Sequence, residues 1–338
     1  KVSRGFSLGF TCLLYLTIGP FFAVPRCATT SFTVGLEQVL PQGNTKLYLL
    51  LFSLAFFAAV LFFAMRPGKI LVWVGKVLNP CFLLFLAVLI VSAMLHPTAT
   101  VADVVPEGKY AAQPFFTGFL EGYNTMDALA SLAFGIIVVQ VIRDLGVQEP
   151  GAIAGSTVRA GVMSCLLMAL IYVAVAIVGA QSRGALPAAA NGGVAFAQIA
   201  RYYLGNTGLI VLAATVTLAC LKTAVGLITG CAETFSALFE KGPSYKAWAI
   251  TFSAASLVFA NLGLDAIIKY SVPVLMLLHP IAIMLIVLTL CGKLFKNDPV
   301  VFRWTITFTA IASIYDMFAA LPKGLWSCLL YTSPSPRD

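Results

Sequence analysis

Residues 209–233 read LIVLAATVTLACLKTAVGLITGCAE, an apolar run with one lysine near its middle. A helix rises about 1.5 Å per residue, so about 20 apolar residues cross a hydrocarbon core of about 30 Å. Similar runs recur along the chain, which has 338 residues and is 60% hydrophobic and 10% charged. Because backbone amides in hydrocarbon find no water to bond, these runs are expected to be helices. The sequence therefore predicts an all-α polytopic membrane protein in a lipid bilayer.

About nine membrane spans follow from the apolar runs. They are predicted at residues 6–32, 47–65, 78–95, 118–142, 157–180, 207–234, 246–262, 267–291 and 302–320. The first is long, and it is expected to bend at Pro20 and Pro25. Between the fifth and sixth spans, residues 180–206 are expected to form a loop followed by a short surface helix.

Basic residues are unevenly distributed between the connections. Twelve Lys and Arg residues lie before the first span and in every second connection after it, against six in the other connections. The positive-inside rule then predicts that the first set is cytoplasmic. This distribution accounts for the formal net charge of +8 without any nucleic-acid partner.

The cysteines and histidines give no sign of a catalytic or metal site. The eight cysteines contain no CxxC pair and mostly lie in apolar runs, which is typical of packing residues. His96 and His279 each precede a proline, which favours a helix end or kink over a catalytic base. The chain also lacks HExxH and GxxxxGK[ST] sequences. An integral-membrane enzyme is therefore a weak alternative, and no cofactor is expected.

The strongest candidate for a break in a spanning helix is FLEGYNTMDALASLAFG, residues 119–135. Gly122, Asn124, Thr125 and Asp127 interrupt the apolar pattern with residues that weaken a helix interior. Transporters build polar sites at mid-membrane by breaking helices in this way. A helix restarting near Asp127 would point its positive N-terminal end at an anion such as a carboxylate. The alternative is that residues 118–125 are an outer loop and Asp127 is an N-cap.

Two charged residues need partners within the predicted spans. Arg26 follows a proline in the first span, and it could extend outward to the interface or pair with an acid such as Glu121 or Asp127. We favour a structural pairing over a contact with the substrate. Asp316 is a lone acid in the last span, and we assign it no role.

Lys222 is a further charged residue within a predicted span. It lies about 16 Å from the span end near Glu233, which is too far for a lysine arm to reach. We therefore expect it to face a water-filled cavity or a polar partner. The Thr223 hydroxyl and backbone carbonyls one turn earlier could hold a small hard cation such as sodium, and the lysine ammonium could occupy that place instead. A lysine with a neutral structural partner is the remaining interpretation.

The segment YLTIGPFFAVPRCATTSF, residues 15–32, resembles the signature of the bacterial branched-chain amino acid:cation symporters, the LIVCS family of BrnQ-type carriers. Further matches are RPGK at 66–69, GFLEGYNTMDALASLAFGIIV at 118–138, ANGG at 190–193, LACLKTAVGLITGCAETF at 218–235, ANLGL at 260–264 and SVPVL at 271–275. The resemblance implies import of leucine, isoleucine and valine with Na⁺ or H⁺, by alternating access, across the bacterial inner (plasma) membrane. A transporter of another small neutral substrate with the same fold is the alternative.

The family is similar to the leucine-transporter (APC-type) fold, with twelve helices and a five-plus-five inverted repeat. The resemblance implies that the chain begins at the third helix and lacks the first two and the last. It also implies one transporter bundle over residues 1–325, followed by a non-native or disordered tail at 326–338. The oligomeric state does not follow from it.

The resemblance also assigns site residues. The substrate would be lined by the second broken helix, at Gly122, Tyr123, Asn124, Thr125, Met126 and Asp127. Residues of the first span would approach it: Tyr15, Gly19 and Phe22. The sixth span resembles the helix in which an alanine carbonyl and two hydroxyl residues bind sodium. Those positions here are Ala219, Lys222 and Thr223, so the lysine would replace sodium or carry a coupling proton.

Overall fold

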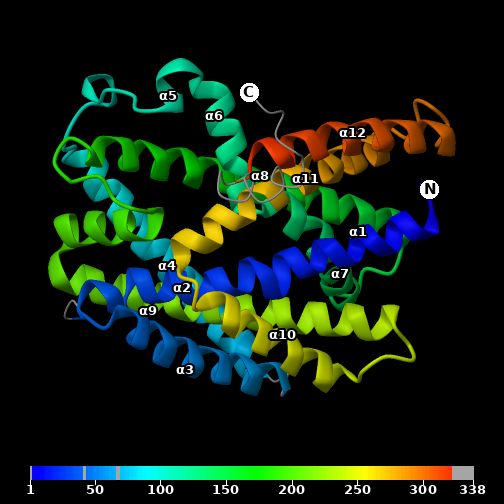
Figure 1. Cartoon of the computed structure of the whole chain (residues 1–338), viewed down its shortest axis with the longest axis horizontal. Coiled ribbons are helices and arrows are strands. Elements are labelled where there is room, and N and C mark those ends of the chain that lie inside the picture. The colour runs from blue at the N-terminus through cyan, green and yellow to red at the C-terminus, as the bar shows by residue number, and fades with distance from the viewer. Residues whose placement is uncertain (1, 41–42, 66–68, 322–338) are drawn as a thin grey trace, which may run out of the picture.

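The computed structural model describes residues 2–40, 43–65 and 69–321, with the backbone alone for 69–79, 136, 137 and 140. All regular elements in these ranges are helices, and no strand occurs there (Figure 1). The elements are α1 (Arg4–Leu16), η1 (Thr17–Phe21), α2 (Ala23–Val34), η2 (Leu36–Gln38), α3 (Thr45–Met65), α4 (Lys69–Leu95), η3 (Val101–Asp103), α5 (Lys109–Ala112), α6 (Pro114–Glu121), η4 (Gly122–Thr125), α7 (Asp127–Asp144), α8 (Pro150–Ser182), α9 (Gly192–Leu238), α10 (Tyr245–Ala260), α11 (Leu264–Leu290) and α12 (Pro299–Ala319). The expected tail at 326–338 lies outside the described residues.

Helices occupy each of the nine predicted spans. Within the described residues, five helical segments are long and apolar enough to cross a membrane by themselves, namely Arg4–Gln38, Thr45–Met65, Pro150–Ser182, Gly192–Leu238 and Leu264–Leu290. The all-helical, apolar character of the chain agrees with a polytopic membrane protein. The number of spans and the inverted repeat remain predictions.

The first span bends once rather than twice. A π-helical turn, η1, contains Pro20, and Gly19 within it has non-helical dihedrals (φ −93°, ψ −114°). Pro25 lies in the first turn of α2, where it causes no break. A proline is tolerated there because the amide N–H that it lacks would have no partner inside the helix. The predicted bend at Pro25 is therefore wrong.

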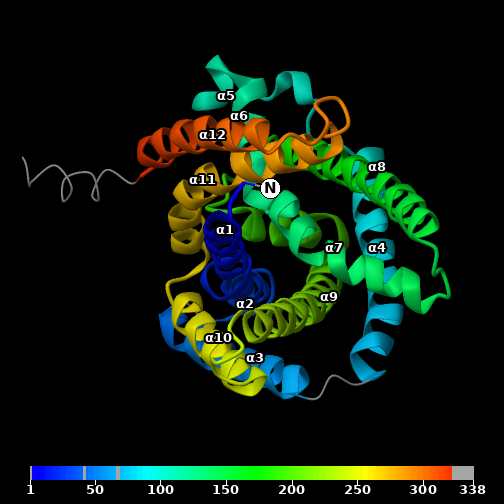
Figure 2. The ribbon, with the colours of Figure 1, turned by 90° about the vertical axis from the view of Figure 1, so that its right-hand side faces the viewer.

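The kinked helix α1–α2 and the long helix α9 form the centre of the bundle (Figure 2). Helix α9 packs along α2, and α3, α10, α7 and α11 complete one apolar core. Fully buried members include Val24 on α2, Leu129 on α7 and Ile228 on α9. These contacts bring the break near α7 against elements that are remote in the sequence.

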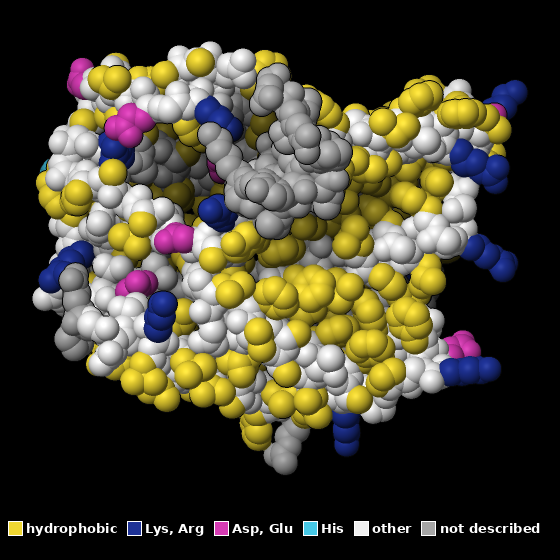
Figure 3. Space-filling view, in the orientation of Figure 1, with side chains coloured by type: hydrophobic (Ala, Val, Ile, Leu, Met, Phe, Trp, Pro, Cys, Tyr) yellow, Lys and Arg dark blue, Asp and Glu magenta, His cyan; other side chains and the backbone are white. Residues whose placement is uncertain are grey.

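The connections sort to the two ends of the bundle. The N-terminus and the turns between α9 and α10 and between α11 and α12 lie at the right-hand end in Figure 1. Lys and Arg side chains project from this end with some acidic side chains beside them, and side chains of both signs also occur at the opposite end (Figure 3). The connections at the right-hand end belong to the set that the positive-inside rule predicts to be cytoplasmic. The connection with Arg66 lies outside the described residues.

The start of α9 differs from the predicted surface helix. Gly205 has a positive φ of 64° and divides α9 into an outer segment, 192–204, and a long helix. The loop before Gly192 agrees with the prediction. However, Ile199 and Ala200 of the outer segment are buried with Leu89 of α4 in a second apolar core. The outer segment therefore belongs to the body of the bundle.

Candidate functional site

The predicted break separates two helices. Helix α6 ends at Glu121, a 3₁₀ turn covers Gly122–Thr125, and α7 begins at Asp127. Met126 joins them in the left-handed conformation (φ 61°, ψ 13°), which is rare for a residue other than glycine. Residues 118–125 are thus helical on the approach to the break rather than a loop. Asp127 is the first residue of α7, and the N-cap position belongs to Met126.

Arg26 of α2 holds this break. Its Nη1 atom donates a hydrogen bond of 2.7 Å to the backbone carbonyl of Asn124. Among the described residues, Arg26 makes no ion pair with Glu121 or Asp127, so the expected pairing with an acid is wrong. A broken helix leaves carbonyls without intrahelical partners, and a guanidinium satisfies one of them here. The side-chain Oδ1 of Asn124 is buried and has no hydrogen-bond partner in the described part of the chain.

Asp127 is anchored to α8. The Tyr172 hydroxyl donates a hydrogen bond of 2.7 Å to its Oδ2 atom. A carboxylate in the first turn is stabilised by the positive end of the helix, and α7 begins at this residue. The contact holds the start of α7 beside the middle of α8.

Tyr123 connects the break to α11. Its ring stacks on His279, with centroids 4.5 Å apart and an angle of 6° between the planes. His279 is 2% exposed and lies inside α11, where Nδ1 is 3.2 Å from the Leu275 carbonyl. The proline at 280 does not end the helix, whereas α4 does end just before His96. His279 is therefore a packing partner of the break within a continuous helix.

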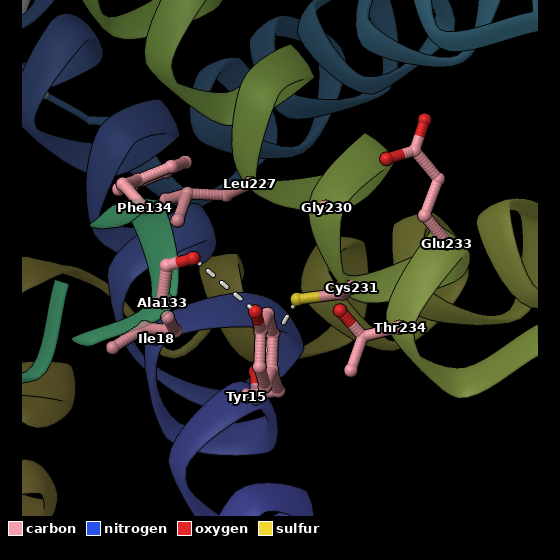
Figure 4. A pocket seen from close by; sticks show the side chains of 9 residues that line it. All are labelled: Tyr15, Ile18, Ala133, Phe134, Leu227, Gly230, Cys231, Glu233 and Thr234. Carbon is pink, nitrogen blue, oxygen red and sulfur yellow. Dashed lines mark hydrogen bonds between the residues drawn. The ribbon is translucent and has the colours of Figure 1, made fainter. Parts of the chain in front are cut away.

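Tyr15 joins α1 to α7 and α9. Its hydroxyl points to the Ala133 carbonyl, at 3.3 Å, and the Cys231 thiol lies 3.4 Å from its backbone carbonyl (Figure 4). These residues line a cavity of about 40 Å³, and the Glu233 side chain at its rim points away from Tyr15. Small-molecule sites have volumes of about 300–1,000 Å³, so this cavity is too small for an amino acid.

Gly19, Phe22 and Met126, also predicted at the substrate site, are packed, whereas Gly122 and Thr125 are exposed. A Cβ atom added to Gly19 would lie 2.5 Å from the Cys231 sulfur, so the glycine permits the close approach of η1 and α9. Met126 is 4% exposed in the central core, and Phe22 packs against that core. At Gly122 an added Cβ would meet open space.

The three predicted cation positions lie on α9. The Thr223 hydroxyl donates a hydrogen bond of 3.0 Å to the Ala219 carbonyl, as a threonine often does within a helix. Lys222 is half-buried, and no hydrogen bond or ion pair to it is found among the described residues. No hydrogen bond there joins these positions to the break. In the same part of the chain, no group of three or more His, Cys, Asp or Glu residues is arranged to hold a metal ion.

The structure thus gathers the break residues with α2, α8 and α11, and no hydrogen bond among the described residues links the α9 positions to them. Sequence reasoning missed three neighbours of the break, which are Tyr172, His279 and the Arg26 contact with a carbonyl. It also gave no role to Asn191, whose amide donates a hydrogen bond of 2.8 Å to Asp265. The quoted motif ANGG at 190–193 was a signal for that residue.

Comparison with known proteins identifies the family. A family model described as "Branched-chain amino acid transport protein" matches residues 1–331. The branched-chain amino acid permease BrnQ of Lactobacillus delbrueckii subsp. lactis is 52% identical over 96% of this chain and 73% of its own length. BrnQ of Bacillus subtilis is 39% identical over 94% of this chain and 71% of its own length. The branched-chain amino acid transport system 2 carrier protein of Pseudomonas aeruginosa is 38% identical over 96% of this chain and 73% of its own length.

These relatives are transporters, so the family excludes the enzyme alternative. The apolar helices of the bundle agree with a multi-pass bacterial membrane protein. The chain belongs to the branched-chain amino acid transport protein family.

Proposed function

We propose that this protein is a secondary carrier that imports leucine, isoleucine and valine with Na⁺ or H⁺ by alternating access. The proposal includes a leucine-transporter-like inverted-repeat bundle. The single observation that carries it is the break between α6 and α7, where a polar turn is held among three other helices. Family membership supports the substrate class, since the relatives are named for branched-chain amino acids.

In the proposed site, the amino acid binds at residues 122–127, with Tyr15, Gly19 and Phe22 nearby. The first amide groups of α7 have no partners inside the helix, and together with the helix dipole they favour a carboxylate. Carbonyls at the end of α6 would accept hydrogen bonds from the substrate ammonium group. One methylene is worth about 1–3 kcal/mol in an apolar pocket, so the three substrates should compete with one another.

For the coupling step, we propose that Lys222 either replaces a sodium ion or carries the proton. A lysine near the middle of a membrane helix costs about 2.5–3.5 kcal/mol on insertion scales, so it requires a compensating role. Its half-buried position on α9, without an ion pair among the described residues, supports a group that is free to change its charge. Ala219 and Thr223 flank it and would supply oxygen ligands if sodium binds.

The test is leucine uptake into proteoliposomes, with a sodium gradient or a proton gradient imposed separately. Wild type is compared with Lys222→Ser, and Lys246→Ser removes the same charge from an exposed site at the end of the bundle. If Lys222 carries the proton, wild type responds to protons and Lys222→Ser alone loses that response. If sodium drives wild type and Lys222→Ser is unchanged, Lys222 is not the coupling group. If neither gradient drives uptake by the folded protein, the carrier assignment is wrong.

A further inference from the structure

Four basic residues gather at one corner of the bundle, at the end that the positive-inside rule predicts to be cytoplasmic. Arg4 begins α1, Lys293 and Lys296 lie in the turn between α11 and α12, and Arg303 lies in the second turn of α12. All four residues are exposed. The start of α1 and the turn before α12 lie at the same end of the bundle (Figure 1). We call these four residues the basic corner.

Two kinds of contact hold the basic corner together. The Arg303 Nε atom donates a hydrogen bond of 3.0 Å to the backbone carbonyl of Val2, which is 301 residues away in the chain. Beneath this bond, Phe6 of α1 packs against a small apolar core that includes Leu288 and Phe302. The tertiary structure therefore places the bases of the first helix beside those of the last described one.

No acid balances these charges within the described ranges. None of the four bases there lies within 4.0 Å of a carboxylate oxygen. The acid beside them in sequence, Asp298, is the N-cap of α12 and accepts a hydrogen bond of 2.8 Å from a backbone amide. By contrast, Glu240 adjoins Lys241 in the turn between α9 and α10. The positive-inside rule accounts for the number of bases at this end, but it does not require that they meet at one place.

Arg303 has hydrogen-bond donors to spare. Its Nε atom is used by the Val2 carbonyl, and its Nη1 and Nη2 atoms make no hydrogen bond among the described residues. A guanidinium presents such donors in a planar fork that matches two oxygens of a phosphate group. The basic corner is thus suited to an anion with several oxygen atoms.

Large apolar side chains are exposed beside the basic corner. Leu290 and Leu294 are 77% and 86% exposed at the end of α11 and in the following turn. Trp304, next to Arg303, is 60% exposed and stacks on Phe308 one turn further along α12. Tryptophan is enriched at the level of lipid head groups. A positive surface that continues into an apolar one matches a ligand with an anionic head and apolar chains.

We propose that the basic corner binds the head group of an anionic phospholipid such as phosphatidylglycerol. Arg303 donates to the phosphate oxygens through its Nη atoms, and the three other bases add positive charge around them. The acyl chains lie along Trp304 and Phe308. A soluble anion would use the charges and leave this apolar surface uncovered. The lipid site shares no residue with the break at 122–127, and it does not depend on what the break binds.

The test is native mass spectrometry of the detergent-solubilised protein, which counts bound lipids as phosphatidylglycerol or phosphatidylcholine with the same acyl chains is added. Lys293→Gln/Lys296→Gln removes two charges from the basic corner. Lys241→Gln/Lys246→Gln is the matched control, since it removes two exposed charges from the turn between α9 and α10 and the start of α10. We expect wild type and the control to prefer phosphatidylglycerol, and the first variant to bind it about tenfold more weakly. Thermal unfolding without added lipid shows that both variants are folded.

A second variant tests the fork. Arg303→Lys keeps the charge but loses the paired donors, so it should bind phosphatidylglycerol about threefold more weakly or less tightly still. Equal weakening in the two double variants would show a general effect of surface charge and overturn the site. Equal binding of both lipids by wild type would also overturn it. If inorganic phosphate displaces phosphatidylglycerol better than chloride at equal ionic strength, the basic corner binds a free anion, and the lipid assignment is wrong.

Discussion

Arg26 and Asn124 are 98 residues apart in the chain, and a hydrogen bond of 2.7 Å joins the guanidinium of one to the backbone carbonyl of the other. This contact connects the kinked first helix to the break between α6 and α7. It satisfies a carbonyl that the break removes from the helical pattern.

The Arg26 contact predicts a loss of transport when the guanidinium is removed. Hydrogen bonds to charged groups are worth about 1.5–3 kcal/mol, which corresponds to at least a tenfold change in rate. We therefore expect Arg26→Gln to lower kcat/KM for leucine uptake about tenfold or more. Arg201→Gln, at an exposed position of the outer segment of α9, is the control. Equal uptake by Arg26→Gln and wild type, at equal amounts of protein, would contradict this role.

The close approach of Gly19 to Cys231 predicts a destabilised Gly19→Ala variant. The new methyl group would meet the sulfur at 2.5 Å, and overpacking typically costs about 1–3 kcal/mol. Removal of the sulfur in Gly19→Ala/Cys231→Ala should recover much of the loss, because the next atom is 3.7 Å away. Thermal unfolding in detergent measures both variants. Gly226→Ala, where the added Cβ meets open space inside helix α9, should unfold at or above the wild-type temperature.

The stacked pair of Tyr123 and His279 predicts different effects for two substitutions. An aromatic pair contributes about 0.5–1.5 kcal/mol beyond its buried area, and His279→Phe preserves the pair whereas His279→Ala removes it. We expect His279→Ala to lower Tm by about 2 °C or more, and His279→Phe to lower it less. The exposed residue His96 serves as the control in His96→Ala. An equal fall in Tm in both His279 variants would show that the loss of stability does not come from the stacked ring.

The hydrogen bond from Tyr172 to Asp127 predicts a role for α8 in holding the start of α7. Tyr172 is 46% exposed, so solvent screens the contact and we take about 1 kcal/mol for the lost bond, below the range of about 1.5–3 kcal/mol for a charged acceptor. Tyr172→Phe should therefore raise KM for leucine about fivefold. Tyr270→Phe removes a hydroxyl of similar exposure from α11 and should leave KM unchanged. A wild-type KM in Tyr172→Phe would show that Asp127 needs no such anchor.

Much of the fold was predictable because its causes are local. A run of about 20 apolar residues can satisfy its backbone amides in a membrane only as a helix, and helices lie at all nine predicted runs. The break was predictable for the same reason. Gly122, Asn124 and Thr125 weaken the helix where they stand, and α7 resumes at Asp127 as the pattern indicates.

The partners of the polar groups were decided by the tertiary structure. Arg26 binds a carbonyl rather than an acid, because the crossing of α2 and the break brings that carbonyl within reach. Asn191 and Asp265 are 74 residues apart, and nothing in their local sequence specifies that they meet. Helix formation and helix breaking depend on neighbours a few residues away, so the sequence by itself determines them. The match between a donor and its acceptor depends on how remote helices pack, and that packing arises only when the whole bundle assembles.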